Sequence, residues 1–143
     1  MTQALLDVNV LLALLDSDHV DHATAAAWLD GAIGDGWASC PITENGFVRV
    51  ISQPRYPSPV SPAVAVDLLD RARQGGRHTL WPCDVSLLDD ATVRRTRLHG
   101  ARQVTDAYLL ALAVRHGGRL VTFDRSLPLS AVPGANPEHL VVL

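Results

Sequence analysis

Residues 4–15 have the sequence ALLDVNVLLALL, in which a short apolar run, an aspartate and a longer apolar run follow one another. The run at 4–6 is short and β-compatible, which predicts a strand, and residues 10–15 form a second hydrophobic segment. Asp7 therefore stands at the carboxyl end of a predicted strand. In open α/β sheets the ligand crevice lies at that end of the strands.

Strand-like and helix-like segments alternate along the rest of the chain. Four more segments are β-compatible, at residues 36–40, 78–81, 119–123 and 140–143. Apolar residues recur at the spacing of one helix face in residues 25–32, 44–51, 65–72 and 107–114. This alternation predicts an α/β three-layer sandwich, with a mostly parallel central sheet and helices on both faces.

The composition is that of an ordinary globular domain. Of the 143 residues, 48% are hydrophobic and 19% are charged, which excludes an intrinsically disordered chain. The proline-rich loop at 54–62 separates two predicted helices, so we expect residues 1–143 to form a single domain. Cys40 and Cys83 match no zinc or redox spacing, and we expect both to be buried free thiols.

No targeting or membrane segment is predicted. The apolar N-terminal stretch lacks a basic leader and is interrupted by Asp7 and Asn9. No run approaches the roughly 20 apolar residues that cross a bilayer. We therefore expect a soluble, cytoplasmic protein with no membrane partner.

The charge balance gives only weak guidance about partners. The net charge of −3 argues weakly against a nucleic-acid partner. All 12 basic residues are arginines, because the chain contains no lysine. Acids held in one metal site would have their charge offset by the bound cation.

Most of the acidic residues have a structural explanation. We expect ten of the thirteen aspartates to lie on helix faces, at helix ends or in turns. Among them, Asp84 is predicted to cap a helix, and Asp89 and Asp90 to lie on a helix face. The acids that need another explanation are Asp7, Glu44, Asp106 and Asp124.

These four acids are predicted to meet at one edge of the sheet. Asp7 and Asp124 directly follow strands, while Glu44 and Asp106 open helices that follow a strand or loop. In right-handed βα units the start of the helix lies at the same edge as the carboxyl end of the strand. Glu44 and Asp106 also lie in apolar helix segments, where a carboxylate is costly unless it is paired or binds a metal. Helix capping is the alternative for these two.

Clustered carboxylates at a sheet edge predict a site for a hard divalent cation. Left alone, four like charges would raise one another's pKa values. Oxygen ligands select Mg²⁺, with Mn²⁺ as a substitute, and no cysteine–histidine set competes. Such an ion can activate water and stabilise a leaving oxygen in phosphodiester hydrolysis.

Four segments together resemble a known family. They are residues 7–12 (DVNVLL), 43–50 (TENGFVRV), 105–113 (TDAYLLALA) and 120–125 (LVTFDR), and they look like the four motifs of PIN-domain ribonucleases. The VapC-type toxins of bacterial toxin–antitoxin pairs are the subgroup that the chain resembles most. Four weak motifs in order make a specific signal, which extends over essentially the whole chain.

The resemblance implies a PIN-like fold and Mg²⁺-dependent endoribonuclease activity. It places the acidic metal site on Asp7, Glu44, Asp106 and Asp124, and Asn9 and Thr122 match neighbouring polar positions. Asp7 and Asp106 are the first choice for direct ligands, with the other two completing the site directly or through water. The resemblance also implies an RNA substrate, a homodimer and a small cognate antitoxin.

Several arginines precede the Asp106 motif. Arg95, Arg97 and Arg102 are candidates for contact with RNA phosphates, because the planar guanidinium binds phosphate well. The alternative is a solvated helix face on which they pair with Asp89 and Asp90.

Other functions compete with a toxin. Phosphoacceptor domains and haloacid-dehalogenase-type phosphatases need an active-site lysine, which this chain lacks. A nucleotide-binding module lacks its glycine-rich motif. A PIN-type RNA-processing nuclease without antitoxin and a non-catalytic RNA-binding protein with a vestigial site remain as alternatives.

Overall fold

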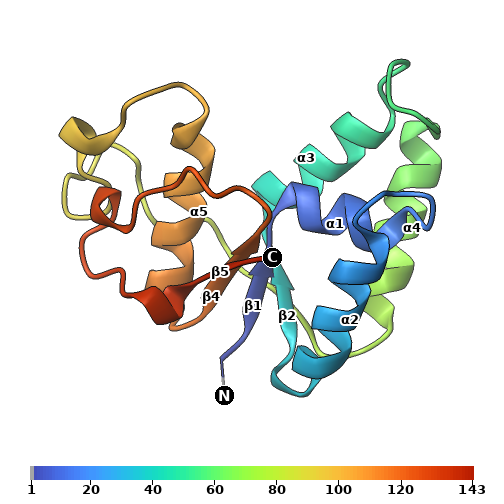
Figure 1. Ribbon diagram of the computed structural model, residues 1–143, viewed down its shortest axis with the longest axis horizontal. Helices are drawn as coiled ribbons and strands as arrows, with labels where there is room; N and C mark the ends of the chain where they lie inside the picture. The colour runs from blue at the N-terminus through green and yellow to red at the C-terminus, as the bar shows by residue number, and fades with distance from the viewer. Residues whose placement is uncertain (1) are drawn as a thin grey trace.

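A computed structural model describes residues 2–143 (Figure 1). Within this range the chain forms five strands and five α-helices. In chain order these are β1 (Ala4–Leu6), α1 (Val8–Leu15), α2 (His22–Ala32), β2 (Trp37–Ser39), α3 (Pro41–Ile51), α4 (Pro62–Gln74), β3 (His78–Leu80), α5 (Gln103–Arg115), β4 (Arg119–Thr122) and β5 (Leu140–Val142). Each strand predicted from an apolar run and each helix predicted from the helical spacing of apolar residues is present, and the hydrophobic run at 10–15 lies in α1.

The five strands form one sheet in the order β3-β2-β1-β4-β5. Every neighbouring pair is parallel, so the sheet that was predicted to be mostly parallel is parallel throughout. β1 lies at the centre, and its three residues are at most 1% exposed. A strand covered on both faces is apolar along its whole length, which explains the uninterrupted run at 4–6.

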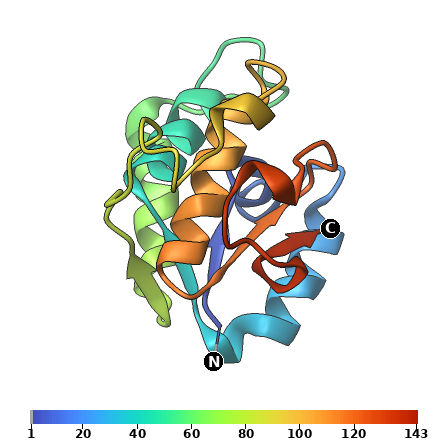
Figure 2. The same ribbon diagram turned by 90° about the vertical axis from the view of Figure 1, so that its left-hand side faces the viewer.

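Helices cover both faces of this sheet, which confirms the three-layer prediction. Leu5 packs on one face in a core with α5, whereas Ala4 and Leu6 pack on the other with α1, α3 and α4. Figure 1 shows α5 on one side of the strands and α1 to α4 on the other. Figure 2, turned by 90°, shows α5 lying in front of the sheet.

Two helices begin directly at the carboxyl ends of β1 and β2. Asp7 caps α1 by accepting a hydrogen bond from the Val8 amide, and Pro41 occupies the first turn of α3, where its missing N–H costs nothing. These two helices pack closely, since a Cβ built on Gly46 would lie 2.6 Å from Val8 Cγ2. The sheet edge that carries the candidate site is thus enclosed by the start of both helices.

The segment between β3 and α5 departs from the prediction. Asp89 and Asp90 lie in turns that lead to a short 3₁₀ segment, Arg95–Arg97, and not on an α-helix. Asp84 caps no helix, and its carboxylate contacts His116 at 3.0 Å and Arg115 at 3.5 Å instead. The cap prediction was wrong because it considered only local sequence, whereas Asp84 is held by the distant end of α5.

The two cysteines also differ from each other. Cys40 is buried, as predicted, but Cys83 is exposed because it lies in the surface loop that follows β3. Neither forms a disulfide. Within residues 2–143, no helix is both long and apolar enough to cross a membrane.

Candidate metal centre and active site

Asp7 is a buried carboxylate at the centre of the sheet edge. It is 6% exposed, and its two oxygens accept hydrogen bonds from the Val8 amide at 2.7 Å and from the Thr122 hydroxyl at 2.8 Å. Burial raises the pKa of Asp7 above its usual 3.8, and the charge of Asp124 adds to the rise, while the two hydrogen bonds oppose it. Placing this acid inside the fold therefore costs free energy unless it has a further partner.

Thr122 and Asn9 join the first motif to the last. The Thr122 oxygen accepts hydrogen bonds from Asn9 Nδ2 at 3.3 Å and from the Asp124 amide at 3.1 Å. Asn9 Oδ1 in turn accepts from the Phe123 amide at 3.3 Å. The polar positions suggested by the resemblance thus contact both the Asp7 and the Asp124 segments.

The charges of Asp7, Asp106 and Asp124 act on one another. Burial raises the pKa of Asp106 to about 7, together with the charge of Asp7 and a hydrogen bond to Asp124. Hydrogen bonds from the Ser126 amide and hydroxyl, at 2.8 and 2.7 Å, and from Asp106 lower the pKa of Asp124. Without a cation, the Asp106 carboxyl is therefore only partly ionised near neutral pH, whereas Asp124 is ionised.

Neither helix acid serves as a cap. The cap of α5 is Arg102, and Asp106 is the fourth residue of the helix. In α3 the cap is Cys40, whose backbone exchanges hydrogen bonds with the Thr43 side chain. Neither acid is thus the N-cap residue, but both lie in the first turn of their helix, where the helix dipole favours a carboxylate.

The donor set suits a hard divalent cation. Asp7, Asp106 and Asp124 bring only carboxylate oxygens together, and such ligands favour Mg²⁺ or Mn²⁺. Among residues 2–143, no group of three or more His, Cys, Asp or Glu side chains is already arranged as a cage for an ion. The fit rests on the donor chemistry and on the mutual repulsion of these acids, which a cation would relieve.

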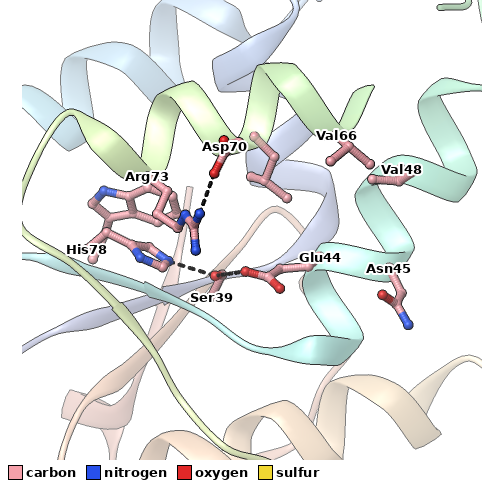
Figure 3. A pocket seen from close by; sticks show the side chains of 10 residues that line it. Ser39, Glu44, Asn45, Val48, Val66, Asp70, Arg73 and His78 are labelled. Carbon is pink, nitrogen blue, oxygen red and sulfur yellow. Dashed lines mark hydrogen bonds and ion pairs between the residues drawn. The ribbon is translucent and has the colours of Figure 1, made fainter. Parts of the chain in front are cut away.

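Glu44 has a different set of contacts. Its Oε2 accepts a hydrogen bond from the Ser39 hydroxyl at 2.8 Å, and Ser39 Oγ lies 2.7 Å from His78 Nε2 (Figure 3). Burial lowers the pKa of His78, with the Arg73 charge acting in the same direction and Glu44 in the opposite one. Three of the four predicted acids thus lie close enough for their charges to shift one another's pKa, whereas the fourth is bonded to Ser39 on β2.

Sequence reasoning missed Ser39, His78 and Ser126. Ser39 is fully buried and is the last residue of β2. The rule that singled out Asp7, a polar residue at the carboxyl end of a buried strand, would have found it if applied beyond acids. His78 and Ser126 carry no such signal, because only the fold brings them near Glu44 and Asp124.

The arginines near the site divide into two kinds. Arg102 lies close enough to Asp124 for its charge to lower the pKa of that carboxyl. Arg95 instead pairs with Asp90 at 3.3 Å and donates to the Leu88 carbonyl at 3.1 Å. Arg97 is exposed in the 3₁₀ segment. The alternative of solvated arginines that pair with acids holds for Arg95 and Asp90, although the pair does not lie on an α-helix.

Residues 4–133 match the family model of the PIN domain. The chain belongs to the PIN domain family. This PIN domain is 66% identical over 141 residues to Ribonuclease VapC44 of Mycobacterium tuberculosis, with 99% of each chain covered. The resemblance to VapC-type proteins drawn from the four motifs is thereby confirmed.

Two solved structures share the fold. VapC20 of Mycobacterium tuberculosis, a sarcin–ricin loop cleaving toxin, matches with a TM-score of 0.62 and 14% identity over 94% of this chain and 100% of that chain. VapBC2 of Rickettsia felis, bound to a DNA fragment from its promoter, matches with a TM-score of 0.61 and 13% identity over 99% and 98% of the two chains. At such low identity these likenesses concern the fold alone.

Proposed function

We propose that this PIN domain is a metal-dependent endoribonuclease that hydrolyses RNA phosphodiester bonds, and that residues 1–143 act as one nuclease domain. The observation that carries the proposal is that Asp7, Asp106 and Asp124 lie at the carboxyl edge of the sheet, near enough for their charges to raise the pKa values of Asp7 and Asp106. The ribonuclease name of a relative with 66% identity supports the same activity. Three ionised carboxylates would repel an RNA phosphate, so this cluster suits RNA only when a cation is bound.

The acidic residues of the site have separate proposed roles. Asp7 and Asp106 would hold Mg²⁺, or Mn²⁺ in its place, and Asp124 and Glu44 would complete the site directly or through water. When bound, the ion supplies an activated water and stabilises charge on the phosphoryl oxygens. Thr122 holds Asp7 in position through its hydrogen bond.

Two further groups orient the reactants. Ser126 donates two hydrogen bonds to Asp124 and keeps that carboxylate ionised. Arg102, beside Asp124, is placed to hold an RNA phosphate, whereas Arg95 and Arg97 are the weaker candidates for the same role.

Cleavage of RNA by the purified chain tests this function. Structured RNA should be cut when Mg²⁺ or Mn²⁺ is added, and a chelator should stop the reaction. Asp7→Asn and Asp106→Asn should abolish cleavage, while Asp67→Asn, at an exposed position on α4, should leave it unchanged. Undiminished cleavage by either site variant would overturn the site assignment.

Metal binding gives a second test that does not depend on the RNA chosen. Calorimetric titration with Mn²⁺ should show binding to the wild type and none to a variant with Asp7→Asn, Glu44→Gln, Asp106→Asn and Asp124→Asn. Equal binding by the two proteins would overturn the proposed chemistry.

We further propose that the enzyme is the toxin of a type II toxin–antitoxin pair that acts in the cytoplasm as a homodimer. The VapC name of its relatives and the fold shared with VapBC2 support an antitoxin partner. A small gene adjacent to or overlapping this one, whose product blocks cleavage, is the expected finding. Its absence would favour an RNA-processing nuclease without antitoxin.

A further inference from the structure

A pocket of about 280 Å³ lies beside Glu44, between α3, α4 and the two strands β2 and β3. Its floor is the face of the sheet that carries Trp37, Ser39 and His78, and its walls come from the two helices (Figure 3). The three aspartates are not among its lining residues. The pocket is therefore separate from the aspartate cluster but shares Glu44 with the candidate active site.

The polar groups on the floor form a chain of fixed direction. Ser39 has one hydroxyl hydrogen, and it goes to the Glu44 carboxylate, which can only accept. His78 Nε2 must therefore carry a hydrogen and donate it to Ser39 Oγ. These hydrogen bonds hold the His78 ring in a defined orientation on the pocket floor.

Flat surfaces line the other end of the pocket. The rings of Trp37 and His78 lie with their centroids 4.4 Å apart on adjacent strands. The Arg73 guanidinium is held by an ion pair with Asp70, both on α4, and lies on the His78 side of the pocket in Figure 3. Nucleobases stack on aromatic rings and on guanidinium planes. Trp37 is only 5% exposed, so the half-buried His78 ring and the Arg73 guanidinium are the surfaces available to a base.

Charge and size argue against a phosphate in the pocket and for a base. Glu44 and Asp70 both line it, and its one arginine is already paired with Asp70, so an anion would meet net negative charge. The volume is close to the lower limit of about 300 Å³ for ligand pockets, which suits a single planar group. Val48 on α3 and Val66 on α4 lie near each other in Figure 3, and both line the pocket and supply apolar contact.

We propose that this pocket binds one unpaired nucleobase of the RNA next to the bond that is cut, and so determines base preference at that position. The proposal rests on the proposed ribonuclease function and adds a subsite to it. The base and not the phosphate enters the pocket, because the pocket has flat surfaces for stacking and its arginine is already paired with Asp70.

Binding of mononucleotides tests the pocket without any cleavage. The four ribonucleoside 5′-monophosphates are titrated into the metal-free chain, and the NMR signals of the Trp37 indole and the His78 ring are followed. At least one nucleotide should give saturable shifts, and ribose 5-phosphate, which lacks a base, should give none. Equal shifts with ribose 5-phosphate, or no shifts with any nucleotide, would overturn the proposal.

Two exposed valines on α4 provide a matched pair of variants. Val66→Trp should fill the opening and abolish the shifts, whereas Val64→Trp, outside the pocket, should preserve them. Both positions are more than 40% exposed (52% and 43%), so both variants should fold. Nucleotide binding that survives Val66→Trp would place the base elsewhere and overturn the proposal.

A cleavage experiment links the pocket to base preference. RNA substrates with an abasic sugar at successive positions around the cut should be cleaved normally except at one position, where the rate falls about tenfold or more. Val66→Trp should cut the normal RNA at that reduced rate and show no further loss on the abasic one. If the wild type cleaves every abasic RNA at the normal rate, the proposal that the pocket binds a base is overturned, but the proposed ribonuclease function is not. A chain that cuts no RNA contradicts the proposed function, while the NMR titration still decides the pocket.

Discussion

The Thr122 hydroxyl donates a hydrogen bond to Asp7 Oδ2 at 2.8 Å, between the carboxyl ends of the neighbouring strands β4 and β1. The same oxygen accepts from Asn9 and from the Asp124 amide. Thr122 is 1% exposed, so water cannot replace these contacts. One buried hydroxyl therefore positions two of the candidate metal ligands at once.

Removing this hydroxyl should weaken metal binding without unfolding the protein. Thr122→Val keeps the shape of the side chain but leaves Asp7 Oδ2 without its hydrogen bond. Groups that orient metal ligands typically contribute about 10–100-fold to metal affinity or activity, and we expect a loss in that range. Mn²⁺ titration and the cleavage rate measure it. Thr122→Ser, which keeps the hydroxyl, should retain most activity, and equal loss in both variants would contradict the role.

The carboxyl of Asp106 should make the metal-free protein less stable as the pH rises. Its pKa is about 7 in the fold and near 3.8 in the unfolded chain. Because the folded pKa is raised, stability is full below about pH 4 and is lost progressively as the pH rises to about 7. Each pKa unit corresponds to about 1.4 kcal/mol, and solvent screening of this partly buried group reduces the total.

Asp106→Asn should therefore stabilise the metal-free protein while abolishing cleavage. We expect a gain of about 1–2 kcal/mol at pH 8, or a rise in Tm of about 3–8 °C, and a smaller gain at pH 5. Thermal unfolding in chelator measures the effect. Saturating Mg²⁺ should raise the Tm of the wild type but not of the variant. An unchanged or lower Tm of the variant at pH 8 would contradict the conclusion that the ionised Asp106 carboxylate destabilises the metal-free fold.

The strands and helices could be predicted because their signals are local. The apolar runs and the 3.6-residue repeat give each element, and the alternation gives the parallel sheet. Asp84 could not be placed, since its partners on α5 lie about 30 residues away in sequence and no local pattern reports them. Its contacts depend on how the loop folds back on the helix.

The acids of the site were predicted unevenly for the same reason. Sequence position brings Asp7, Asp106 and Asp124 to one sheet edge, where their charges act on one another's pKa values. Glu44 starts from the same edge, but its side chain direction is decided by the Ser39 hydroxyl. A backbone rule predicts where a residue stands and leaves open which neighbour its side chain contacts.

Two neighbouring arginines should differ in their effect on RNA. Arg102→Ala should raise KM for RNA, because Arg102 lies beside Asp124. The slope of log binding constant against log salt concentration should fall by about 1, the value for one lost phosphate contact. Arg95→Ala should change RNA binding little, since Arg95 is already paired with Asp90. RNA binding measured across a range of salt concentrations separates the two. A larger salt effect from Arg95 than from Arg102 would reverse the assignment.

The close packing of α1 on α3 gives a prediction that opposes helix propensity. Replacing a glycine inside a helix by alanine normally stabilises it by about 1 kcal/mol. At Gly46 the new methyl group would lie 2.6 Å from Val8 Cγ2, and the stiff β-branched valine has little freedom to move. Overpacking of this kind costs about 1–3 kcal/mol, so Gly46→Ala should lower stability. Because the Val8 amide donates a hydrogen bond to the Asp7 carboxylate, the rate of RNA cleavage should fall as well.

In a Val8→Ala background the clash is absent, and there Gly46→Ala should become neutral or stabilising. Chemical denaturation of the wild type, both single variants and the double variant measures this coupling. A Gly46→Ala protein more stable than the wild type, with Val8 present, would show that the two helices have room to separate.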